Sequence, residues 1–262
     1  MMQQVHKVRR ALSMPLTYRN FVTAWFNRLR PTVETDRMVL YRLREGVDLI
    51  AAPGPHDVRI INEIWLEREY AFPGFVPEPG WTIVDLGANK GYYTAWALTM
   101  APDARIISYE PDPRTYAILQ ANLSKFGTAF QTHQCAVGSA AGSLVLFRLA
   151  GRPGQASLSK SRALTRGEIV KEIDVEVIPF TDVVADLDHV DLLKIDVEGA
   201  EYDIILNSPR DAFDNVHRIA IEADDHDPDN PARPVETLLK HLRDVGYTSA
   251  SRSGYLWFLS RQ

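Results

Sequence analysis

The sequence predicts an α/β protein built around a mostly parallel β-sheet. From Trp81 onward, short apolar segments alternate with segments of helical spacing, which is the pattern of parallel strands joined by helices. The last two apolar segments, 247–252 and 255–260, flank Ser253-Gly254 and indicate an antiparallel hairpin. A length of 262 residues fits one large domain, or one domain with an added arm. With 45% hydrophobic and 24% charged residues, the composition excludes collagen, coiled coils and wholesale disorder.

The chain begins with a basic arm, which we expect over residues 1–36. Residues 1–33 contain six Lys or Arg and no acid, so they carry +6, and residues 34–262 must carry −11 to give the net charge of −5. Apolar residues recur at helical spacing on both sides of Pro15, which predicts two short amphipathic helices. The arm could dock on its own domain, join a second copy of the chain in a homo-oligomer, or contact a membrane surface.

A small extension is expected next, over residues 37–79. It combines a β-hairpin around Glu45-Gly46, with strands at 38–43 and 47–52, and a helix at 56–69. A proline-rich connector from Pro73 to Gly80 then marks the boundary before the main domain, residues 80–262.

The main domain supplies the parallel sheet. Its five parallel strands are expected at 81–85, 105–110, 130–136, 190–196 and 216–222, and its helices at 91–100, 113–126, 200–207 and 234–245. Two further strands, near 143–148 and 169–178, bracket the segment 151–167, which is rich in Gly, Ser and Arg. A loop of that length in a compact domain indicates a mobile cover or disorder, and its basic residues suggest an anionic or hydroxyl-rich ligand.

Composition also limits the surroundings and partners of the chain. No apolar segment approaches the roughly 20 residues that span a bilayer, and no secretory signal is evident, so we expect no transmembrane segment and a cytoplasmic protein. The single cysteine, Cys135, excludes an intrachain disulfide and fits a reducing compartment. A net charge of −5 makes nucleic acid an unexpected partner.

A glycine-containing turn follows the first parallel strand. The segment Asp85–Gly91 reads Asp-Leu-Gly-Ala-Asn-Lys-Gly, so its glycines have the spacing G-x-x-x-G instead of the dinucleotide pattern G-x-G-x-x-G. A nucleotide would lie over this turn, at the carboxyl end of the strand. Because Asp85 would repel a pyrophosphate and attract a cationic amino acid or sulfonium, the turn favours S-adenosylmethionine over NAD.

An acid also closes the second parallel strand. Glu110 follows Gly91 by nineteen residues, at the place where a strand-end carboxylate accepts hydrogen bonds from a ribose diol. Asp112 lies two residues further and has two interpretations, an approach to the adenine side of the ligand or an N-cap before Pro113. We expect Ala88, Tyr93 and Ala136 to complete the cofactor site.

A second group of charged residues lies at the ends of the fourth and fifth strands. Asp196 ends the fourth strand, and Lys194 shares its face, where it either takes part in the chemistry or only neutralises an interior carboxylate. If the two strands are neighbours, Asp196 and Glu222 lie about 5 Å apart. The pair could hold Mg²⁺ or Mn²⁺ together with Asp224, or could act as a metal-free base. The acidic segment 224–229 could equally be a solvated loop.

Four segments together resemble the FkbM-type methyltransferases. They are DLGANKGYYT, YEPDP, Cys-Ala-Val-Gly and LLKIDVEGAE, and the resemblance covers roughly residues 55–225. It implies S-adenosylmethionine-dependent O-methylation, a class I Rossmann-like fold, and a seven-stranded sheet that ends in an antiparallel hairpin. It also implies that the acceptor is a hydroxyl of a small molecule, commonly a sugar, glycan or secondary metabolite.

The resemblance assigns roles residue by residue. It implies that the cofactor is held by Asp85, Gly87, Asn89, Gly91 and Glu110, and that Asp196 and Glu198 face the reaction. The family often has Glu, a small apolar residue and His at the last parallel strand, whereas here His226 is displaced from Glu222. We expect catalysis to involve Lys194, Asp196, Glu198, Glu222 and His226. The alternatives are a methyltransferase acting on RNA or protein, and a non-catalytic module that only binds S-adenosylmethionine.

Overall fold

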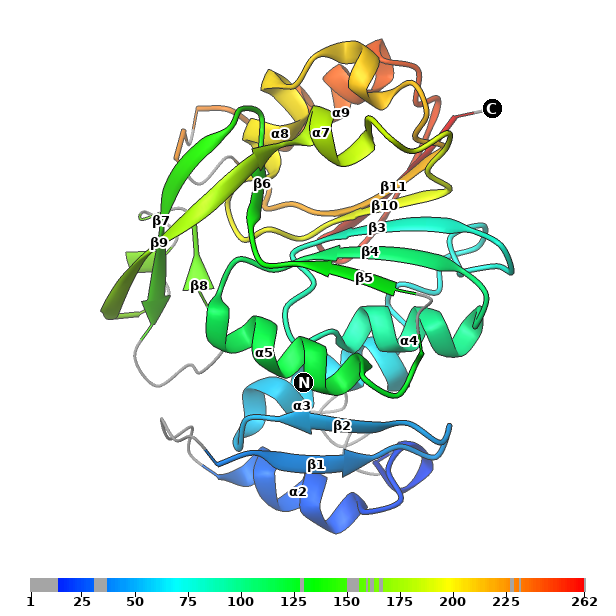
Figure 1. Cartoon of the computed structure of the whole chain (residues 1–262), viewed down its shortest axis with the longest axis vertical. Helices are drawn as coiled ribbons and strands as arrows, with labels where there is room; N and C mark the ends of the chain where they lie inside the picture. The colour runs from blue at the N-terminus through cyan, green and yellow to red at the C-terminus, as the bar shows by residue number, and fades with distance from the viewer. Residues whose placement is uncertain are drawn as a thin grey trace, which may run out of the picture.

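The computed structural model describes residues 14–30, 37–127, 130–149, 156–158, 160, 163–164, 167–226, 229–230 and 232–261. Its centre is a seven-stranded sheet with the order β12-β13-β11-β10-β3-β4-β5 (Figure 1). The strands are β3 (Thr82–Leu86), β4 (Arg105–Tyr109), β5 (Phe130–His133), β10 (Leu192–Ile195), β11 (Arg218–Glu222), β12 (Ser249–Ser253) and β13 (Leu256–Ser260). In this sheet β13 runs antiparallel to both of its neighbours, β11 and β12, and the other pairs are parallel. The predicted α/β class and terminal hairpin are therefore confirmed.

Helices cover both faces of this sheet (Figure 1). One face carries α4 (Tyr92–Met100) and α5 (Pro113–Leu123), and the other carries α7 (Phe180–Val184), α8 (Glu201–Asn207) and α9 (Val235–Asp244), with the 3-10 helix η2 (Arg210–Phe213). Every residue of β3 is buried, because β3 is central and covered on both sides. The apolar runs predicted from the sequence therefore match these elements to within a few residues.

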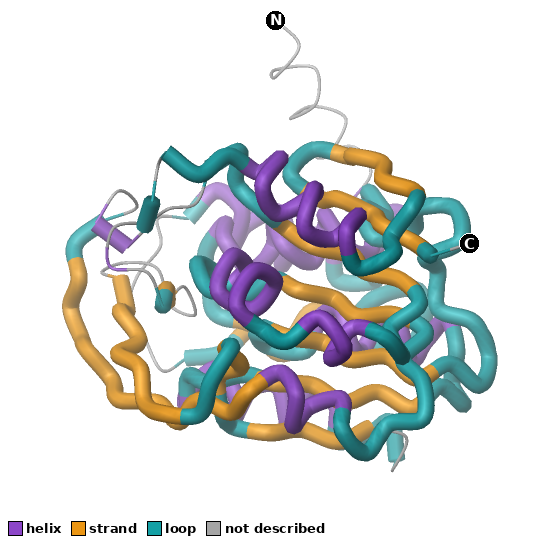
Figure 2. The backbone as a smooth tube through the Cα atoms, turned by 90° about the horizontal axis from the view of Figure 1, so that it is seen from above, coloured by secondary structure: helices purple, strands orange, loops and turns teal. Residues whose placement is uncertain are grey.

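A second sheet projects from one end of the central one, as Figures 1 and 2 show from two directions. It has the order β6-β9-β7-β8, with β6 (Ala136–Gly138), β7 (Gly142–Leu149), β8 (Ala156–Ser157) and β9 (Ile169–Pro179). The predicted strand 130–136 is wrong in its extent, because β5 ends at His133 and Ala136 already pairs with β9. Most of the segment 151–167 lies outside the described residues.

The N-terminal elements lie at the lower end of the molecule in Figure 1, below α4 and α5. They are α2 (Phe21–Leu29), β1 (Val39–Arg42), β2 (Asp48–Ala51), α3 (Pro55–Ile61) and the π-helix η1 (Asn62–Leu66). The predicted hairpin is confirmed by the pairing of β1 with β2. The first predicted helix of the arm falls largely on residues 1–13, outside the described residues.

The extension shares its hydrophobic core with the main domain. Trp65 of η1 and Trp96 of α4 belong to one buried cluster, which also contains side chains of β1, β2 and β4. Asp57 at the start of α3 accepts a hydrogen bond from the buried Lys90 ammonium at 2.7 Å and another from the Tyr92 hydroxyl at 3.1 Å. The extension is thereby fixed directly to the turn that precedes α4. Within the described residues, the helices are all too short or too polar to cross a membrane.

Candidate active site

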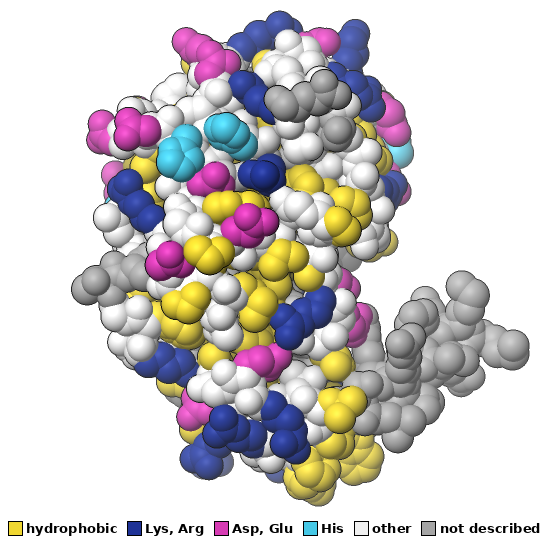
Figure 3. All heavy atoms as spheres, turned by 90° about the vertical axis from the view of Figure 1, so that its right-hand side faces the viewer, with side chains coloured by type: hydrophobic (Ala, Val, Ile, Leu, Met, Phe, Trp, Pro, Cys, Tyr) yellow, Lys and Arg dark blue, Asp and Glu magenta, His cyan; other side chains and the backbone are white. Residues whose placement is uncertain are grey.

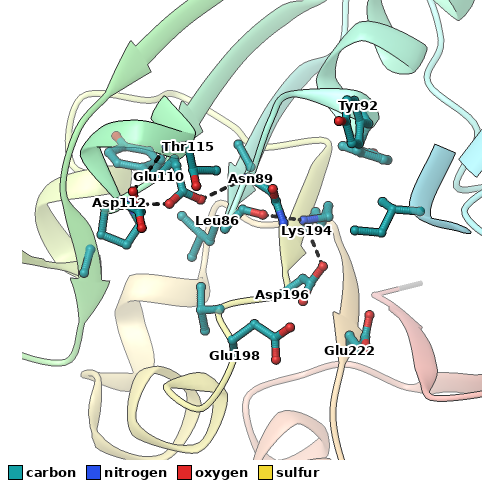
Figure 4. Close-up of a pocket in the computed structure, with 18 of the residues that line it drawn as sticks. Leu86, Asn89, Tyr92, Glu110, Asp112, Thr115, Lys194, Asp196, Glu198 and Glu222 are labelled. Atoms are coloured by element: carbon teal, nitrogen blue, oxygen red, sulfur yellow. Dashed lines mark hydrogen bonds and ion pairs between the residues drawn. The ribbon is translucent and has the colours of Figure 1, made fainter. Parts of the chain in front are cut away.

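A cavity lies at the carboxyl ends of β3, β4, β10 and β11, where open α/β sheets place their ligands (Figure 4). Its floor is the turn after β3, its sides come from the segments after β4 and β10, and the extension closes it with residues of α3 and η1. The predicted site residues that line it are Gly87, Ala88, Asn89, Tyr93, Glu110, Asp112, Ala136, Lys194, Asp196, Glu198 and Glu222.

The turn after β3 is shaped by close backbone approach. Gly87 has a φ of +77°, and a Cβ placed on it would lie only 1.7 Å from the backbone oxygen of Asp196. Its N–H donates to the carbonyl oxygen of Tyr109 at 3.0 Å. Gly91, also at positive φ, begins α4 against Leu119 and does not line the cavity. Because Gly87 has no side chain, the turn after β3 can pack directly against the backbone of the acidic turn after β10.

Glu110 is fixed by the backbone on both carboxylate oxygens. One oxygen accepts from the N–H of Asn89 at 3.0 Å and the other from the N–H of Asp112 at 2.8 Å. The side chain is only 8% exposed, and burial raises its pKa to about 8 despite these hydrogen bonds. This carboxyl group lines the cavity, so a diol entering there meets a hydrogen-bonding group held in a fixed position (Figure 4).

Asp112 serves as the N-cap of α5, and its carboxylate also lines the cavity. It accepts from the N–H groups of Arg114 and Thr115, and Arg148 of β7 donates to both of its oxygens. The structure thus supports the capping interpretation and adds an ion pair to the second sheet. Beside Asp112 the cavity wall is apolar, with Cys135, Ala136, Val137, Leu146 and Leu158.

Asp85 lies beneath the cavity and does not line it. It is completely buried, accepts from the Thr94 hydroxyl at 2.7 Å and pairs with the Lys194 ammonium at 2.9 Å. Lys194 also donates to the Gly87 carbonyl at 3.2 Å and lies 3.7 Å from Asp196. Burial alone would lower the pKa of Lys194, but the nearby carboxylates of Asp85 and Asp196 outweigh it and raise that pKa. Lys194 therefore stays charged between two acids.

Three carboxylates converge on the other side of the cavity. Asp196 follows β10 and Glu222 ends β11, and these strands are hydrogen-bonded neighbours (Figure 4). Glu198 has a φ of +54°, a backbone conformation that non-glycine residues rarely adopt and that concentrates at functional sites. The Ser157 hydroxyl donates to the Glu198 carbonyl at 2.6 Å, so β8 supports this strained turn.

Asp196 and Glu222 both line the cavity, whereas Asp224 follows the end of β11 outside the lining. Among the residues that the structure describes, no group of three or more His, Cys, Asp or Glu side chains is placed to hold a metal ion. A Mg²⁺ or Mn²⁺ ion shared by Asp196, Glu222 and Asp224 stays a prediction that no described cluster supports. His226 is exposed and also lies outside the lining.

The sequence reasoning missed the residues that the extension contributes. His56, Arg59, Glu63, Glu69 and Tyr70 line the cavity, although they lie far from the glycine turn in the sequence. Tyr70 is 7% exposed, and its ring centroid lies 4.8 Å from that of Tyr93. Glu63 lies in a π-helix, and π-helical turns are enriched at functional sites. Because such turns have no sequence signature, only the structure could reveal this one.

Comparison with known proteins identifies the family. The model of the methyltransferase FkbM domain matches residues 85–249. The chain is 26% identical over 243 residues to the 31-O-demethyl-FK506 methyltransferase FkbM of Streptomyces tacrolimicus, which covers 82% of this chain and 90% of that protein. It is 27% identical over 209 residues to the methyltransferase sdnD of Sordaria araneosa, covering 69% of this chain and 79% of that protein.

Solved structures of methyltransferases show a distant likeness. One is the precorrin-6y C5,15-methyltransferase of Geobacter metallireducens, with a TM-score of 0.42, 16% identity, and coverage of 82% of this chain and 91% of that one. The family model spans more than half of the chain and includes both the glycine turn and the acidic turn after β10. The chain therefore belongs to the FkbM family of S-adenosylmethionine-dependent methyltransferases.

Proposed function

We propose that the chain methylates a hydroxyl group of a small molecule, a sugar or glycan, or a secondary metabolite. The observation that carries this proposal is the position of Asp196 and Glu222, which end adjacent strands and face one cavity beside a charged lysine. An alcohol needs a base to remove its proton, and carboxylates at this place can supply one. The relative from Streptomyces tacrolimicus supports an oxygen acceptor, since its name describes a methyltransferase of 31-O-demethyl-FK506.

The residues around the cavity fit S-adenosylmethionine. Glu110 presents a fixed carboxylate suited to a ribose diol, and the apolar wall around Ala136 and Val137 suits an adenine ring. Tyr93 lines the cavity, and its buried hydroxyl has no hydrogen-bond partner among the described residues. Such an orphaned donor fits a ligand that brings the missing acceptor, such as the carboxylate of a bound amino acid.

When bound, S-adenosylmethionine supplies a methyl group that its sulfonium already activates. The chain must then orient the acceptor and remove one proton. We assign proton removal to Asp196, whose side chain is 28% exposed and lines the cavity, so that an acceptor can reach it. Glu222 orients the same hydroxyl, while Lys194 is a positioning residue that holds the Asp196 carboxylate through an ion pair.

The cavity wall favours a neutral, hydroxyl-rich acceptor. Besides Glu110 and Asp112, five carboxylates line the cavity, and the lining cations Arg59 and Lys194 are already paired with acids. The five carboxylates are Glu63, Glu69, Asp196, Glu198 and Glu222. A phosphate or carboxylate on the acceptor would be repelled by these groups, whereas hydroxyls can donate hydrogen bonds to them. This wall argues against the anionic ligand that the basic segment 151–167 suggested.

A cytoplasmic location and the domain boundaries at residues 36 and 79 remain predictions.

A two-part experiment tests the proposal. Calorimetry measures S-adenosylmethionine binding, and labelled methyl transfer is measured with a panel of neutral sugars and hydroxylated metabolites. We expect Asp196→Asn to reduce kcat on the order of a hundredfold or more, because the base is lost, while the Kd for S-adenosylmethionine changes by less than about threefold. Asp214→Asn, at a 74% exposed carboxylate outside the cavity, is the matched control and should behave as the wild type.

Three results would contradict this function. Absence of S-adenosylmethionine binding would remove the cofactor assignment. If S-adenosylmethionine binds equally to the wild type and to Asp196→Asn but no acceptor is methylated, the chain would be a non-catalytic binding module. Methyl transfer to a nitrogen of RNA or protein would favour the alternative methyltransferase class. The expected product, a methyl ether, is identified by its stability in base.

A further inference from the structure

An exposed apolar surface lies at the N-terminal end of the molecule. It combines outer side chains of α2, of the segment just before α2, and of β1 and the residue before it. We call this surface the α2 face. Its residues are Leu16, Phe21, Val22, Trp25, Phe26, Leu29, Met38 and Leu40. These side chains are between 37% and 75% exposed. Figure 3 shows hydrophobic and basic side chains gathered at the lower end of the molecule, where Figure 1 places α2 and β1.

The helix α2 is oriented opposite to the usual amphipathic helix of a globular domain. Its two buried residues are Ala24 and Asn27, one small and one polar, and the Asn27 amide donates to the Thr23 carbonyl. The large side chains of Trp25 and Phe26 point outward instead. An ordinary surface helix buries its large apolar side chains against the core, so this orientation indicates that the outer face contacts something beyond the described chain.

The segments that form the α2 face also carry arginines. The described segments 14–30 and 37–44 contain Arg19, Arg28, Arg30, Arg37, Arg42 and Arg44 and no Asp or Glu. Most of these arginines are exposed. The whole chain carries a net charge of −5, so this positive charge is concentrated in one region of an otherwise acidic molecule. The partner must therefore combine an apolar layer with negative charge.

We propose that the α2 face binds the surface of an anionic phospholipid bilayer. Aromatic and aliphatic side chains of an amphipathic helix enter the boundary between headgroups and acyl chains, and surrounding arginines pair with anionic headgroups. A symmetric contact with a second copy would bring two surfaces of the same positive charge together, because such an interface apposes the same surface of both copies. The nine residues of α2 lie on the membrane and do not cross it.

Vesicle flotation tests the proposal with the full chain. The probes are vesicles of pure phosphatidylcholine and vesicles of phosphatidylcholine and phosphatidylglycerol in equal parts. We expect the wild type to float only with the anionic vesicles, and less at high salt, since the arginine contribution is screened. The double variant Trp25→Ser/Phe26→Ser should lose binding by at least about tenfold, because it removes two interfacial aromatic side chains.

The matched control is Leu144→Ser, which replaces a 42% exposed apolar residue on β7, far from α2 in the fold. It should float as the wild type does. S-adenosylmethionine affinity, measured on every variant, verifies folding independently of membranes. Failure of the wild type to bind anionic vesicles would overturn the proposal, as would equal loss in Leu144→Ser. A wild-type dimer that Trp25→Ser/Phe26→Ser converts to a monomer, without vesicle binding, would overturn it by showing that a second copy covers this face.

Discussion

Lys194 and Asp85 occupy paired positions on the neighbouring strands β10 and β3 and form a buried ion pair of 2.9 Å. Both side chains are almost completely buried, so neither charge is compensated by water. Replacing Lys194 leaves the Asp85 charge buried alone, and replacing Asp85 leaves Lys194 with only the longer contact of 3.7 Å to Asp196. Breaking a buried pair in this way typically costs about 3–5 kcal/mol. We therefore expect Lys194→Met and Asp85→Asn each to lower the free energy of unfolding by that order, measured by urea denaturation.

The double variant Lys194→Met/Asp85→Asn distinguishes the ion pair from lost packing. It should be more stable than the sum of the two single losses predicts, because neither charge of the buried pair remains. Additive losses would show that the two residues do not depend on each other. Asp196 should also lose its fixed position in Lys194→Met, so turnover should fall even in the fraction that remains folded.

Gly87 provides a steric prediction. In Gly87→Ala the new methyl group would approach the Asp196 backbone oxygen at 1.7 Å, so the turn that carries Asp196 must move. We expect kcat/KM to fall by at least about tenfold, since small displacements of positioned groups are costly in catalysis. Gly80→Ala is the matched control, because Gly80 has nearly the same φ of +78° but no atom within 4 Å of the place that its new methyl group would occupy.

Comparing the two alanine variants separates backbone strain at positive φ from the steric clash between the new methyl group and the Asp196 backbone. Gly80→Ala should lose about 1–2 kcal/mol of stability from its positive φ and retain full activity. If Gly87→Ala behaves in the same way, the contact between the two turns does not matter for the site.

Glu110 provides a prediction about pH. Its pKa is raised by burial from 4.5 to about 8 in the folded protein. Between these values the unfolded chain loses a proton that the folded chain retains, so stability falls as pH rises, by about 1.4 kcal/mol per pH unit from this group. The contribution is fully present below pH 4.5 and is lost by about pH 8.

Glu110→Gln should remove this part of the pH dependence. The free energy of unfolding, measured by urea denaturation across the same range, should decline less steeply than in the wild type. The exposed Glu78→Gln is the control and should keep the wild-type slope. S-adenosylmethionine should also bind Glu110→Gln more weakly. An unchanged slope would show that Glu110 titrates normally in the folded protein.

The sequence predicted those parts of the fold and site that depend on local patterns. The apolar runs located β3 and β10, and the spacing of Lys194 and Asp196 predicted that the two side chains share one side, where they lie 3.7 Å apart although β10 ends at Ile195. The sequence could not show that Lys194 forms an ion pair with Asp85, because that contact depends on which strands are neighbours in the sheet. It also missed Tyr70, which reaches the cavity only through the packing of the extension. The strand 130–136 was extended too far because β5 and β6 are adjacent in sequence but belong to different sheets.

Tyr93 provides a prediction that separates binding from folding. Its buried hydroxyl has no hydrogen-bond partner among the described residues, so its removal costs the folded protein no bond. We expect Tyr93→Phe to be as stable as the wild type or more stable, and to bind S-adenosylmethionine about tenfold more weakly by calorimetry, since a buried hydroxyl that meets a charged acceptor contributes roughly 1.5 kcal/mol or more. Tyr41→Phe is the matched control, because the Tyr41 hydroxyl is also buried without a partner in the described chain but does not line the cavity. It should leave the affinity unchanged, and an equal affinity for Tyr93→Phe and wild type would show that the hydroxyl does not contact the cofactor.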